Sequence, residues 1–381
     1  MKICLTVNSS PWSRFKGGGQ IAVHRLAAAL CQKGQEVHVL YSKCPGEAVA
    51  PPPVDYKIHW VRHFNLATFN LNIFSFAQTL SPLAAREKFD VIHGNAEEAF
   101  FHAGICRKYN AACFFTSHAP FIPPTGIVRA LSAPVLLLKR LNVYLLRAAA
   151  ENAGQIVTFS QFSKNLVAAG LGAGAEDKIR VVPPGIDASW LETKRNPQPQ
   201  DQLLFWGRME DEKGIPELLQ AFANVKKRRV NNVRLRLVGE GSRQDDYKRL
   251  ARELGLGTDV TFHGWLDAGE IQNLAAESRA GVFPSRIESF GLAPAEAQAA
   301  GLPVVCTDAG ALPEIVENGS TGTVTPTGDV EKLTDAILNL LEDETKHETM
   351  ARRAREVVRQ KYSWFAAADR ILELYSDARK K

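Results

Sequence analysis

Short apolar runs alternate with amphipathic stretches along almost the whole chain. Runs rich in Val, Ile, Leu and Phe between polar turns predict buried strands, and longer stretches with apolar residues three or four apart predict helices. In the first half we expect strands at residues 2–7, 36–41, 58–61, 90–93, 113–117 and 155–159, and helices at 20–32, 97–108, 127–152 and 161–169. This alternation is typical of parallel sheets covered by helices, the α/β class.

The second half repeats this alternation. Strands are expected at residues 203–206, 235–238, 260–263, 282–283, 302–306 and 323–325, with helices from residue 330 onward and a last helix over 362–375. Between the halves, the prolines and polar residues of 191–202 lack periodicity, which indicates a linker between two domains. In open parallel sheets, ligands bind beyond the carboxyl ends of the strands, so the residues that follow strands are the candidate site residues.

The composition limits the class of protein. The 381 residues are enough for two domains, and a hydrophobic fraction of 45% is ordinary for a globular protein. A net charge of +5 without a basic motif argues against nucleic acid as a partner. The six cysteines stand singly, which does not suggest a metal site. The first residues predict a strand rather than a signal peptide, and no stretch approaches the roughly 20 apolar residues that span a bilayer, so we expect a cytoplasmic protein.

Residues 282–310 carry the strongest chemical signal, and they read as strand, loop, helix and strand. Pro294 suits the first turn of the helix and Gly301 suits its C-terminal cap. The backbone N–H groups at the start of such a helix attract anions, phosphate above all. Glu288 and Glu296 flank this helix end. Carboxylates there would repel phosphate but would bind hydroxyl groups on either side of a diphosphate. A nucleotide sugar has this arrangement, with a sugar ring on one side of its diphosphate and a ribose on the other.

The two glutamates stand in the sequence S-R-I-E-S-F-G-L-A-P-A-E-A-Q-A-A-G-L-P-V-V, with the spacing E-x7-E. This stretch resembles the donor-site motif of retaining GT-B glycosyltransferases of family 4, also called glycosyl transferases group 1. Two glutamates alone would also fit a solvated helix face, but F-G-L between them and A-x-G-x-P-V-V after them make the match specific. The resemblance covers nearly the whole chain and is densest between residues 203 and 328.

The resemblance implies two facing Rossmann-like domains with a cleft between them. The acceptor domain would cover residues 1–190, with the C-terminal helix 363–381 crossing back onto it, and the donor domain would cover residues 202–362. The implied reaction moves a sugar from a nucleoside diphosphate to a hydroxyl acceptor and retains the anomeric configuration. We expect no cofactor; the donor substrate is a UDP-, GDP- or ADP-sugar, with UDP favoured. Because no D-x-D cluster stands at a strand end, we expect no metal requirement.

In the expected donor domain, the motif G-R-x4-K-G places Arg208 and Lys213 on one turn after a strand. A guanidinium and an ammonium on one turn suit a diphosphate, although two such charges also occur in ordinary surface loops. The resemblance assigns both residues to the phosphates and to catalysis. The N–H groups of Gly291 and Leu292, with Phe290 beside them, are expected to hold the same phosphates.

The sugar, ribose and base are expected to have their own contacts in this domain. The resemblance assigns Glu288 to the sugar hydroxyls near the reacting carbon, as a catalytic residue, and Glu296 to the ribose hydroxyls. The remaining nucleotide-binding candidates are Gly239 and Gly241, which would let the backbone approach the nucleotide, and Trp265 and Leu266, which would border the base. Core packing explains Trp265 equally well.

In the expected acceptor domain, a run of three glycines ending in Gly18 and Gly19 follows the first strand. A flexible connection would explain this run, but the resemblance implies that it lies against the donor phosphates and the acceptor. His118 follows a later strand, and the resemblance assigns it to the donor sugar as a catalytic residue. Many relatives have Asp after this histidine, whereas Ala119 stands here, so a His–Asp pair at this place is in doubt.

Two stretches suggest peripheral contact with the inner membrane. Residues 127–152 combine Leu and Val with basic residues, and residues 64–76 are apolar and aromatic. Such surfaces dock on anionic lipid, although a domain helix with solvated basic ends is the simpler account of 127–152. Membrane contact would suit a saccharide or lipid-linked acceptor, and the resemblance favours synthesis of a bacterial cell-envelope polysaccharide or glycolipid.

Two other functions remain open from the sequence. One is a different GT-B activity, such as a phosphorylase that uses free phosphate, although no lysine stands in a context that suggests pyridoxal phosphate. The other is a non-catalytic partner that only binds sugar nucleotides. The presence of both glutamates together with Arg208 and Lys213 argues against the second, since a site without turnover has little physical reason to retain all four.

Overall fold

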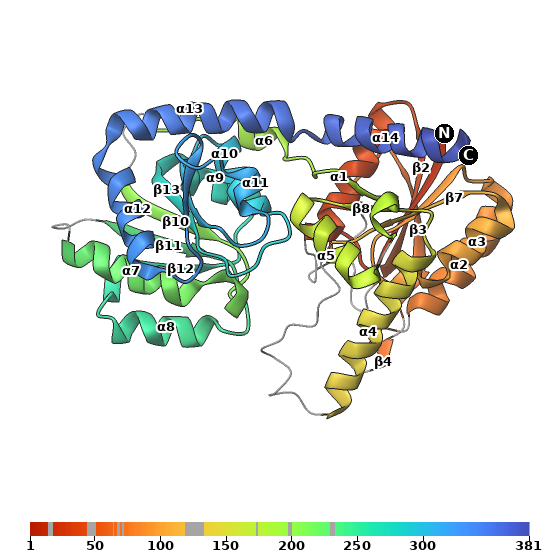
Figure 1. The fold of residues 1–381 in the computed structure, drawn as a ribbon, viewed down its shortest axis with the longest axis horizontal. Coiled ribbons are helices and arrows are strands. Elements are labelled where there is room, and N and C mark those ends of the chain that lie inside the picture. The colour runs from red at the N-terminus through yellow and green to blue at the C-terminus, as the bar shows by residue number, and fades with distance from the viewer. Residues whose placement is uncertain are drawn as a thin grey trace. The chain divides into compact units, whose positions relative to one another are not determined.

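A computed structural model describes residues 1–13, 18–43, 51–63, 65–66, 69–70, 72–118, 133–172, 174–196, 200–228 and 233–380. The chain forms two compact units (Figure 1). The first unit contains Met1–Gly185 and Trp364–Lys381, and the second contains Ile186–Ser363. The polar segment 191–202, expected to link two domains, therefore belongs to the second unit in this division, and the C-terminal segment belongs to the first.

The first unit is built on a seven-stranded parallel sheet with the order β3-β2-β1-β6-β7-β8-β9. Its strands are β1 (Lys2–Val7), β2 (Glu36–Lys43), β3 (Lys57–Arg62), β6 (Val91–Gly94), β7 (Ala112–Thr116), β8 (Gln155–Thr158) and β9 (Ile179–Val181). Its helices are α1 (Gly18–Gln32), α2 (Asn72–Glu87), η1 (Glu97–Phe101), α3 (His102–Tyr109), α4 (Ala133–Asn152), α5 (Gln161–Leu171), η3 (Glu176–Lys178) and α14 (Trp364–Lys380). A short antiparallel pair, β4 (Asn65–Leu66) and β5 (Phe69–Asn70), stands outside the sheet.

The C-terminal helix α14 completes the core of the first unit. Ala368, Ile371 and Tyr375 of this helix are buried in one cluster with residues of α1 and of the strands. The Tyr375 hydroxyl lies 2.6 Å from Nδ1 of His93, a fully buried residue of β6. The hydrogen bond joins residues 282 positions apart, and the apolar contacts bury one face of α14, so the last helix is part of the core of the first unit.

The second unit is built on a six-stranded parallel sheet with the order β12-β11-β10-β13-β14-β15. Its strands are β10 (Gln200–Trp206), β11 (Arg234–Val238), β12 (Val260–Gly264), β13 (Ser278–Phe283), β14 (Val304–Thr307) and β15 (Gly322–Thr325). Its helices are α6 (Ala188–Leu191), η4 (Asp211–Lys213), α7 (Ile215–Arg228), α8 (Gln244–Glu253), η5 (Gly257–Asp259), α9 (Ala268–Glu277), α10 (Leu292–Ala299), α11 (Leu312–Ile315), α12 (Val330–Glu342) and α13 (Glu344–Lys361).

Each sheet reverses its direction of growth at one pair of neighbouring strands. In the first unit this switch lies between β1 and β6, and in the second it lies between β10 and β13. At a switch point the connections leave the two strands on opposite sides, which opens a crevice beyond their carboxyl ends where ligands bind. The topology therefore predicts two candidate binding places. One is formed by the residues after β1 and β6, and the other by the residues after β10 and β13.

The expected strands are present, with ends that differ by a few residues, and the α/β prediction is confirmed. Elements that were not foreseen include α2 and the β4–β5 pair in the first unit, and α6, α8 and α9 in the second. In α2, Ile73, Phe76 and Leu80 are buried in the core, so part of the stretch 64–76 packs inside the unit instead of forming a surface for lipid. The expected helix 97–108 is split into η1 and α3, and residues 127–132 of the expected helix 127–152 lie outside the described residues.

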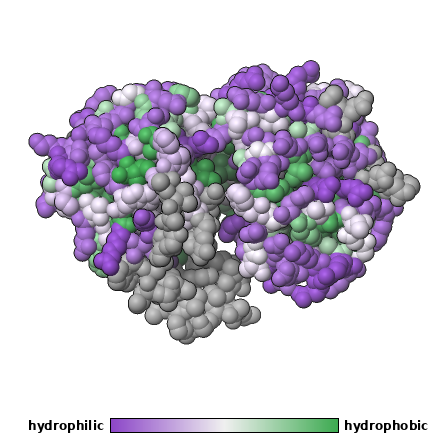
Figure 2. Space-filling model, turned by 180° about the vertical axis from the view of Figure 1, so that it is seen from behind, coloured by the Kyte–Doolittle hydropathy of each residue, from purple (hydrophilic) through white to green (hydrophobic). Residues whose placement is uncertain are grey.

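Within the described residues, each helix is too short or too polar to cross a bilayer. The face shown in Figure 2 is mainly hydrophilic, with separate hydrophobic patches.

Candidate active site

The segment from β13 to β14 folds as its sequence predicts. Pro284 follows the end of β13, and Pro294 lies in the first turn of α10. Gly301 has a φ of +72°, and its N–H donates to the carbonyl oxygen of Gln298 while the next N–H, of Leu302, donates to that of Ala297. This pair of bonds is the Schellman cap of a helix C-terminus, so the predicted role of Gly301 is confirmed.

Gly291 sets the start of α10. It is the N-cap residue and has a φ of +102°, in the left-handed region. A Cβ atom at this position would lie 2.9 Å from Cδ2 of Leu312, so both the backbone and the space favour glycine. The turn leaves the first N–H groups of α10, from Leu292 onward, without partners inside the helix, which makes this end suitable for an anion.

The switch point of the second unit joins the turn after β10 to the loop after β13. At Gly214, which has a φ of +66°, a Cβ atom would lie 1.9 Å from the carbonyl oxygen of Pro284. The N–H of Arg286 donates to the carbonyl oxygen of Glu212 over 2.8 Å. These contacts fix the motif G-R-x4-K-G against the loop that carries Glu288.

Lys213 and Glu288, predicted from different motifs, form an ion pair. The Lys213 Nζ lies 2.6 Å from Oε2 of Glu288, and the two side chains are only 18% and 17% exposed. An ammonium group has three donors, so Lys213 can keep this bond and still donate to a phosphate oxygen. The pairing fixes the Glu288 carboxylate beside a positive charge, at the carboxyl end of the sheet.

Arg208 lies on the same turn but is held less firmly. Its Nη2 donates to Oε1 of Glu212 over 2.6 Å, and 72% of its side chain is exposed. Exposed ion pairs contribute only about 0–1 kcal/mol, so this contact does not prevent the guanidinium from turning toward a ligand.

Glu296 is linked to the end of strand β10. The indole Nε1–H of Trp206 donates to its Oε2 over 3.0 Å. Burial raises the pKa of Glu296 to about 7, the indole N–H opposes that rise, and the carboxylate of Asp187 adds to it. The Trp206 ring stacks on Trp190 with a centroid separation of 5.6 Å. Neither tryptophan was identified from the sequence; the signal available was an aromatic residue at a strand end, directly before G-R.

The two glycines of the predicted base pocket have close neighbours within the protein. Cβ atoms at Gly239 and Gly241 would lie 1.9 Å from the carbonyl oxygen of Gly207 and 2.4 Å from that of Met209. The packing of this loop on the turn after β10 therefore explains both glycines without a ligand. A role beside the nucleotide stays a prediction.

The apolar site candidates differ in exposure. Trp265 is 59% exposed, so it is not a core residue, and Leu266 beside it is half-buried. Phe290 is 4% exposed and packs edge-on against Tyr362, with ring centroids 5.6 Å apart. The side chain of Phe290 thus serves the core, and any contact of this residue with phosphate has to come from its backbone.

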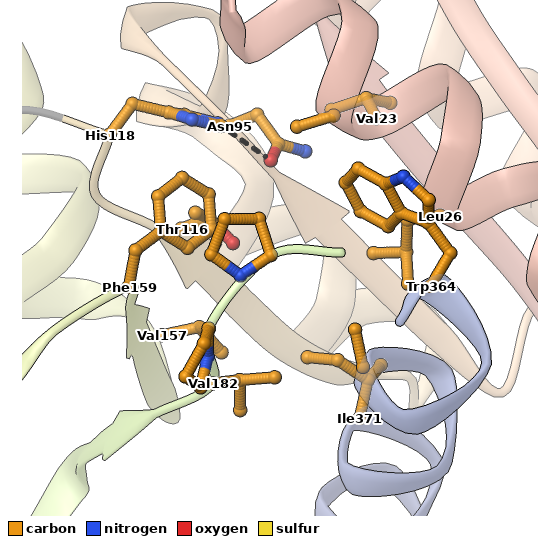
Figure 3. Close-up of a pocket in the computed structure, with 14 residues that line it drawn as sticks. Val23, Leu26, Asn95, Thr116, His118, Val157, Phe159, Val182, Trp364 and Ile371 are labelled. Atoms are coloured by element: carbon orange, nitrogen blue, oxygen red, sulfur yellow. Dashed lines mark hydrogen bonds between the residues drawn. The ribbon is translucent and has the colours of Figure 1, made fainter. Parts of the chain in front are cut away.

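In the first unit, His118 follows β7 at the carboxyl end of the sheet and lies close to Asn95 (Figure 3). Its Nε2 lies 3.1 Å from Oδ1 of Asn95, and a Cβ atom at Gly19 would lie 3.4 Å from its Nδ1. Gly18 begins α1 directly before Gly19. The structure thus brings together the glycines and the histidine that the sequence predicted from separate stretches. Burial lowers the pKa of His118 to about 4, so the imidazole is neutral at pH 7.

Asn95 was not predicted as a site residue. It determines which ring nitrogen of His118 carries the hydrogen. The Asn95 Nδ2 donates to the carbonyl oxygen of Thr6, so its Oδ1 accepts and Nε2 of His118 is the protonated nitrogen. Glu98 supports this arrangement: its Oε1 accepts from the N–H of Asn95 and from the hydroxyl of Thr6. A polar residue directly after strand β6 was the available sequence signal.

His118, Asn95 and Thr116 form the polar wall of a small cavity in the first unit (Figure 3). Its volume is about 30 Å³, and the remaining wall is apolar, from α1, α14 and the ends of β8 and β9. Elsewhere in this unit, Glu36, His38 and Glu87 have the spacing of metal ligands. Lys57 pairs with Glu36 at 2.7 Å and Lys2 with Glu87 at 3.1 Å, so ammonium groups already neutralise both carboxylates.

Comparison with known proteins matches two family profiles to successive parts of the chain. "Glycosyltransferase Family 4" matches residues 16–190, and "Glycosyl transferases group 1" matches residues 188–357. The glycogen synthase of Mycobacterium tuberculosis is 34% identical over 205 residues, which cover 53% of this chain and 49% of that protein. The chain thus spans about half the length of that relative.

Solved structures match the whole chain. Sucrose-phosphate synthase from Thermosynechococcus elongatus superposes with a TM-score of 0.82 at 23% identity, covering 99% of this chain and 98% of that one. HepE of Anabaena, solved in complex with UDP and glucose, superposes with a TM-score of 0.72 at 22% identity and covers 99% of both chains. The fold is therefore GT-B, and with both family profiles matched in sequence, the chain belongs to glycosyltransferase family 4, the glycosyl transferases group 1.

Proposed function

We propose that this protein is a retaining glycosyltransferase that moves a sugar from a nucleoside diphosphate to a hydroxyl acceptor. The observation that carries the proposal is the meeting of Lys213, Glu288 and the N-terminus of α10 at the switch point of the second sheet. One cation and N–H groups that lack partners inside their helix suit phosphate, and a carboxylate at the same place suits a hydroxyl group. A diphosphate attached to a sugar has both.

The charged residues, the N-terminus of α10 and His118 each have a role in this proposal. Lys213, Arg208 and the N–H groups at Gly291 and Leu292 bind the diphosphate. Glu288 accepts from hydroxyl groups of the donor sugar, and Glu296 accepts from the ribose. His118 is assigned to the donor sugar through the family resemblance, and its neutral imidazole is suited to hydrogen bonding with hydroxyl groups.

The proposed reaction needs no protein nucleophile. The bond between the anomeric carbon and the diphosphate oxygen breaks, and its electron pair leaves on the diphosphate. The acceptor oxygen bonds to the anomeric carbon on the same face, and its proton passes to the departing phosphate oxygen. Because negative charge grows on the leaving phosphate, contacts from Lys213 and Arg208 strengthen in the transition state and lower the barrier.

For the donor and acceptor we infer a UDP-sugar and a saccharide or lipid-linked hydroxyl group of a bacterial envelope glycan. HepE, which shares the fold, is solved with UDP and glucose, and this supports a UDP-sugar. On α4, Leu141 and Tyr144 are 38% and 60% exposed, which supports peripheral contact with the inner membrane at the cytoplasmic face. Binding of the full chain to anionic vesicles, compared with a Leu141→Ser/Tyr144→Ser variant, tests that contact.

Turnover distinguishes this function from its alternatives. The purified chain is incubated with UDP-, GDP- and ADP-sugars and a panel of saccharide and glycolipid acceptors, and the release of nucleoside diphosphate is measured. We expect release that depends on an acceptor, and a product with the anomeric configuration of the donor in its NMR spectrum. Phosphate-dependent cleavage of a glycan would instead show a phosphorylase. Tight nucleotide binding without turnover on any acceptor would indicate a binding protein.

A further inference from the structure

We propose that Trp206 is a positioning residue for ribose recognition: its indole N–H holds one oxygen of Glu296, so that the other oxygen is presented to the ribose hydroxyl groups. This inference rests on the proposed function, in which Glu296 accepts from the ribose. It adds a residue from the end of strand β10 and predicts that this residue sets the discrimination between ribose and deoxyribose.

The contact between the two side chains is directional. Trp206 is the last residue of β10, and Glu296 lies in the second turn of α10. The indole Nε1–H is a donor only, and Oε2 of Glu296 accepts from it over 3.0 Å. Trp206 is 6% exposed, whereas Glu296 is partly exposed, so one carboxylate oxygen is held by a core residue while part of the Glu296 side chain is accessible.

The indole ring is fixed by its neighbours. It lies face to face with Trp190, at a centroid distance of 5.6 Å and an interplanar angle of 5°. It meets the ring of Phe283 edge to face, at 4.9 Å and 83°. Trp190 and Phe283 are themselves 3% and 2% exposed. Because a ring packed on two sides cannot turn without opening the core, the direction of the N–H, and with it the orientation of the carboxylate, is fixed before a ligand binds.

The same bond favours the charged form of Glu296. Burial and the nearby Asp187 both raise the pKa of this carboxyl group, and the indole N–H opposes them. Without the N–H, the carboxyl group would hold its proton more strongly. The protonated form offers a ligand one acceptor oxygen fewer than the carboxylate. The 2′- and 3′-hydroxyl groups of a ribose are both donors, so an oriented carboxylate recognises them, and a 2′-deoxyribose leaves part of its capacity unused.

A Trp206→Phe variant keeps an aromatic ring in the stack and removes only the donor. Calorimetry would measure the Kd of UDP and of 2′-deoxy-UDP for the wild-type chain and for this variant, with GDP and ADP pairs if one of those binds more tightly. We expect the wild type to prefer the ribonucleotide by about tenfold, and the variant to lose most of that preference. The affinity for inorganic diphosphate should stay within about twofold of wild type. Trp60→Phe, at an exposed tryptophan of the first unit, is the matched control.

An unchanged preference in a folded Trp206→Phe variant would overturn the role of Trp206 and leave the proposed function standing. A wild-type chain that binds none of the three nucleoside diphosphates would overturn both. If the variant does not fold, the wild-type chain with 15N-labelled tryptophan gives a second test. UDP, but not inorganic diphosphate, should then shift one buried indole N–H resonance, and Glu296→Gln should shift the same resonance. An unmoved resonance would contradict the proposal.

Discussion

The two switch points of this protein have the same topology, but one is lined by charged groups and the other by neutral ones. After β10 and β13, the charged pair of Lys213 and Glu288 lies next to the N-terminus of α10. After β1 and β6, Thr6, Asn95 and His118 form a network of hydrogen bonds. There, burial lowers the pKa of His118 to about 4 and raises the pKa of Glu98 to about 8, so both groups are uncharged at pH 7.

The difference shows what the fold decides and what the side chains decide. In both sheets the reversal of strand order places a few strand-end residues together, and this fixes where a ligand can bind. The charged switch point suits a diphosphate, whose charge needs compensation. The neutral one suits hydroxyl groups, which need oriented donors and acceptors. In the proposed reaction, the charged switch point would therefore bind the diphosphate of the donor, and the neutral one would bind hydroxyl groups of the reacting sugars.

The largest expected effect removes the cation from the charged switch point. Lys213→Ala deletes a donor to the leaving phosphate and leaves Glu288 beside that phosphate without its partner, so we expect turnover to fall by about a hundredfold. Steady-state kinetics with the best donor measures it. Lys226→Ala is the matched control, because Lys226 pairs with Asp259 at 2.9 Å, is 22% exposed and lies in the same unit. Equal turnover of the Lys213→Ala and Lys226→Ala variants would remove Lys213 from the phosphate site.

The second change introduces a charge into the neutral switch point. In Asn95→Asp, a carboxylate would face Nε2 of His118, now 3.1 Å from Oδ1 of Asn95. An opposite charge at this distance favours the imidazolium, so we expect the pKa of His118 to rise by about 2 units from its value of about 4. NMR titration of the histidine side chains measures the shift. A value that stays near 4 in the folded variant would show that Asn95 does not control the charge of His118.

The third prediction concerns stability and pH. The pKa of Glu98 is about 8 in the folded chain, raised mainly by burial, and lies near 4.5 in an unfolded chain. The folded state therefore binds the proton more strongly, and its stability falls as the pH rises from about 4.5 to 8. A glutamine at this position cannot ionise, and its amide oxygen can accept the same bonds, so we expect Glu98→Gln to be more stable than wild type by up to about 5 kcal/mol at pH 9 and to show no gain at pH 4.

Urea unfolding at the two pH values, followed by the fluorescence of the first unit's tryptophans, measures this change. Glu176→Gln, at an exposed residue of the same unit, is the control and should show no such difference. A Glu98→Gln variant with the same pH dependence as wild type would mean that Glu98 is ionised in the folded protein, and the first switch point would then not be neutral.

The smallest effect is expected for Arg208. Its side chain is 72% exposed and pairs with Glu212, so we expect its removal to reduce turnover less than the removal of Lys213. Arg208→Ala should reduce turnover by about tenfold, as expected for one charge-assisted contact to the leaving phosphate. If the loss exceeded that of Lys213→Ala, the exposed arginine and not the half-buried lysine would be the principal phosphate ligand.

Much of the fold could be predicted because it depends on local pattern. Strand β1 has the predicted bounds, and α10 begins and ends near the expected positions because Pro294 and Gly301 act within a few residues of themselves. The charged switch point could also be predicted, since Lys213 and Glu288 each stand in a recognisable motif. That they bond to each other follows only from the pairing of β10 with β13.

The parts that could not be predicted depend on contacts between distant residues. Trp206 bonds to Glu296, 90 positions away in the sequence, and this contact places Trp206 beside the site. Phe290 packs against Tyr362, and this contact places the Phe290 side chain in the core. The neutrality of the first switch point comes from burial, which no short motif encodes. For α2, the spacing of Ile73, Phe76 and Leu80 was a sufficient signal that was instead interpreted as a surface.

The central claim is that the switch point of the second unit binds a nucleoside diphosphate through Lys213 without a metal. Calorimetric titration of the wild-type and Lys213→Ala chains with UDP, GDP and ADP, in buffer with chelator, tests it most directly. We predict micromolar binding of one of the three to the wild type and at least tenfold weaker binding to the variant. Equal affinity of the two chains, or no binding of any nucleotide to the folded wild type, would contradict the account.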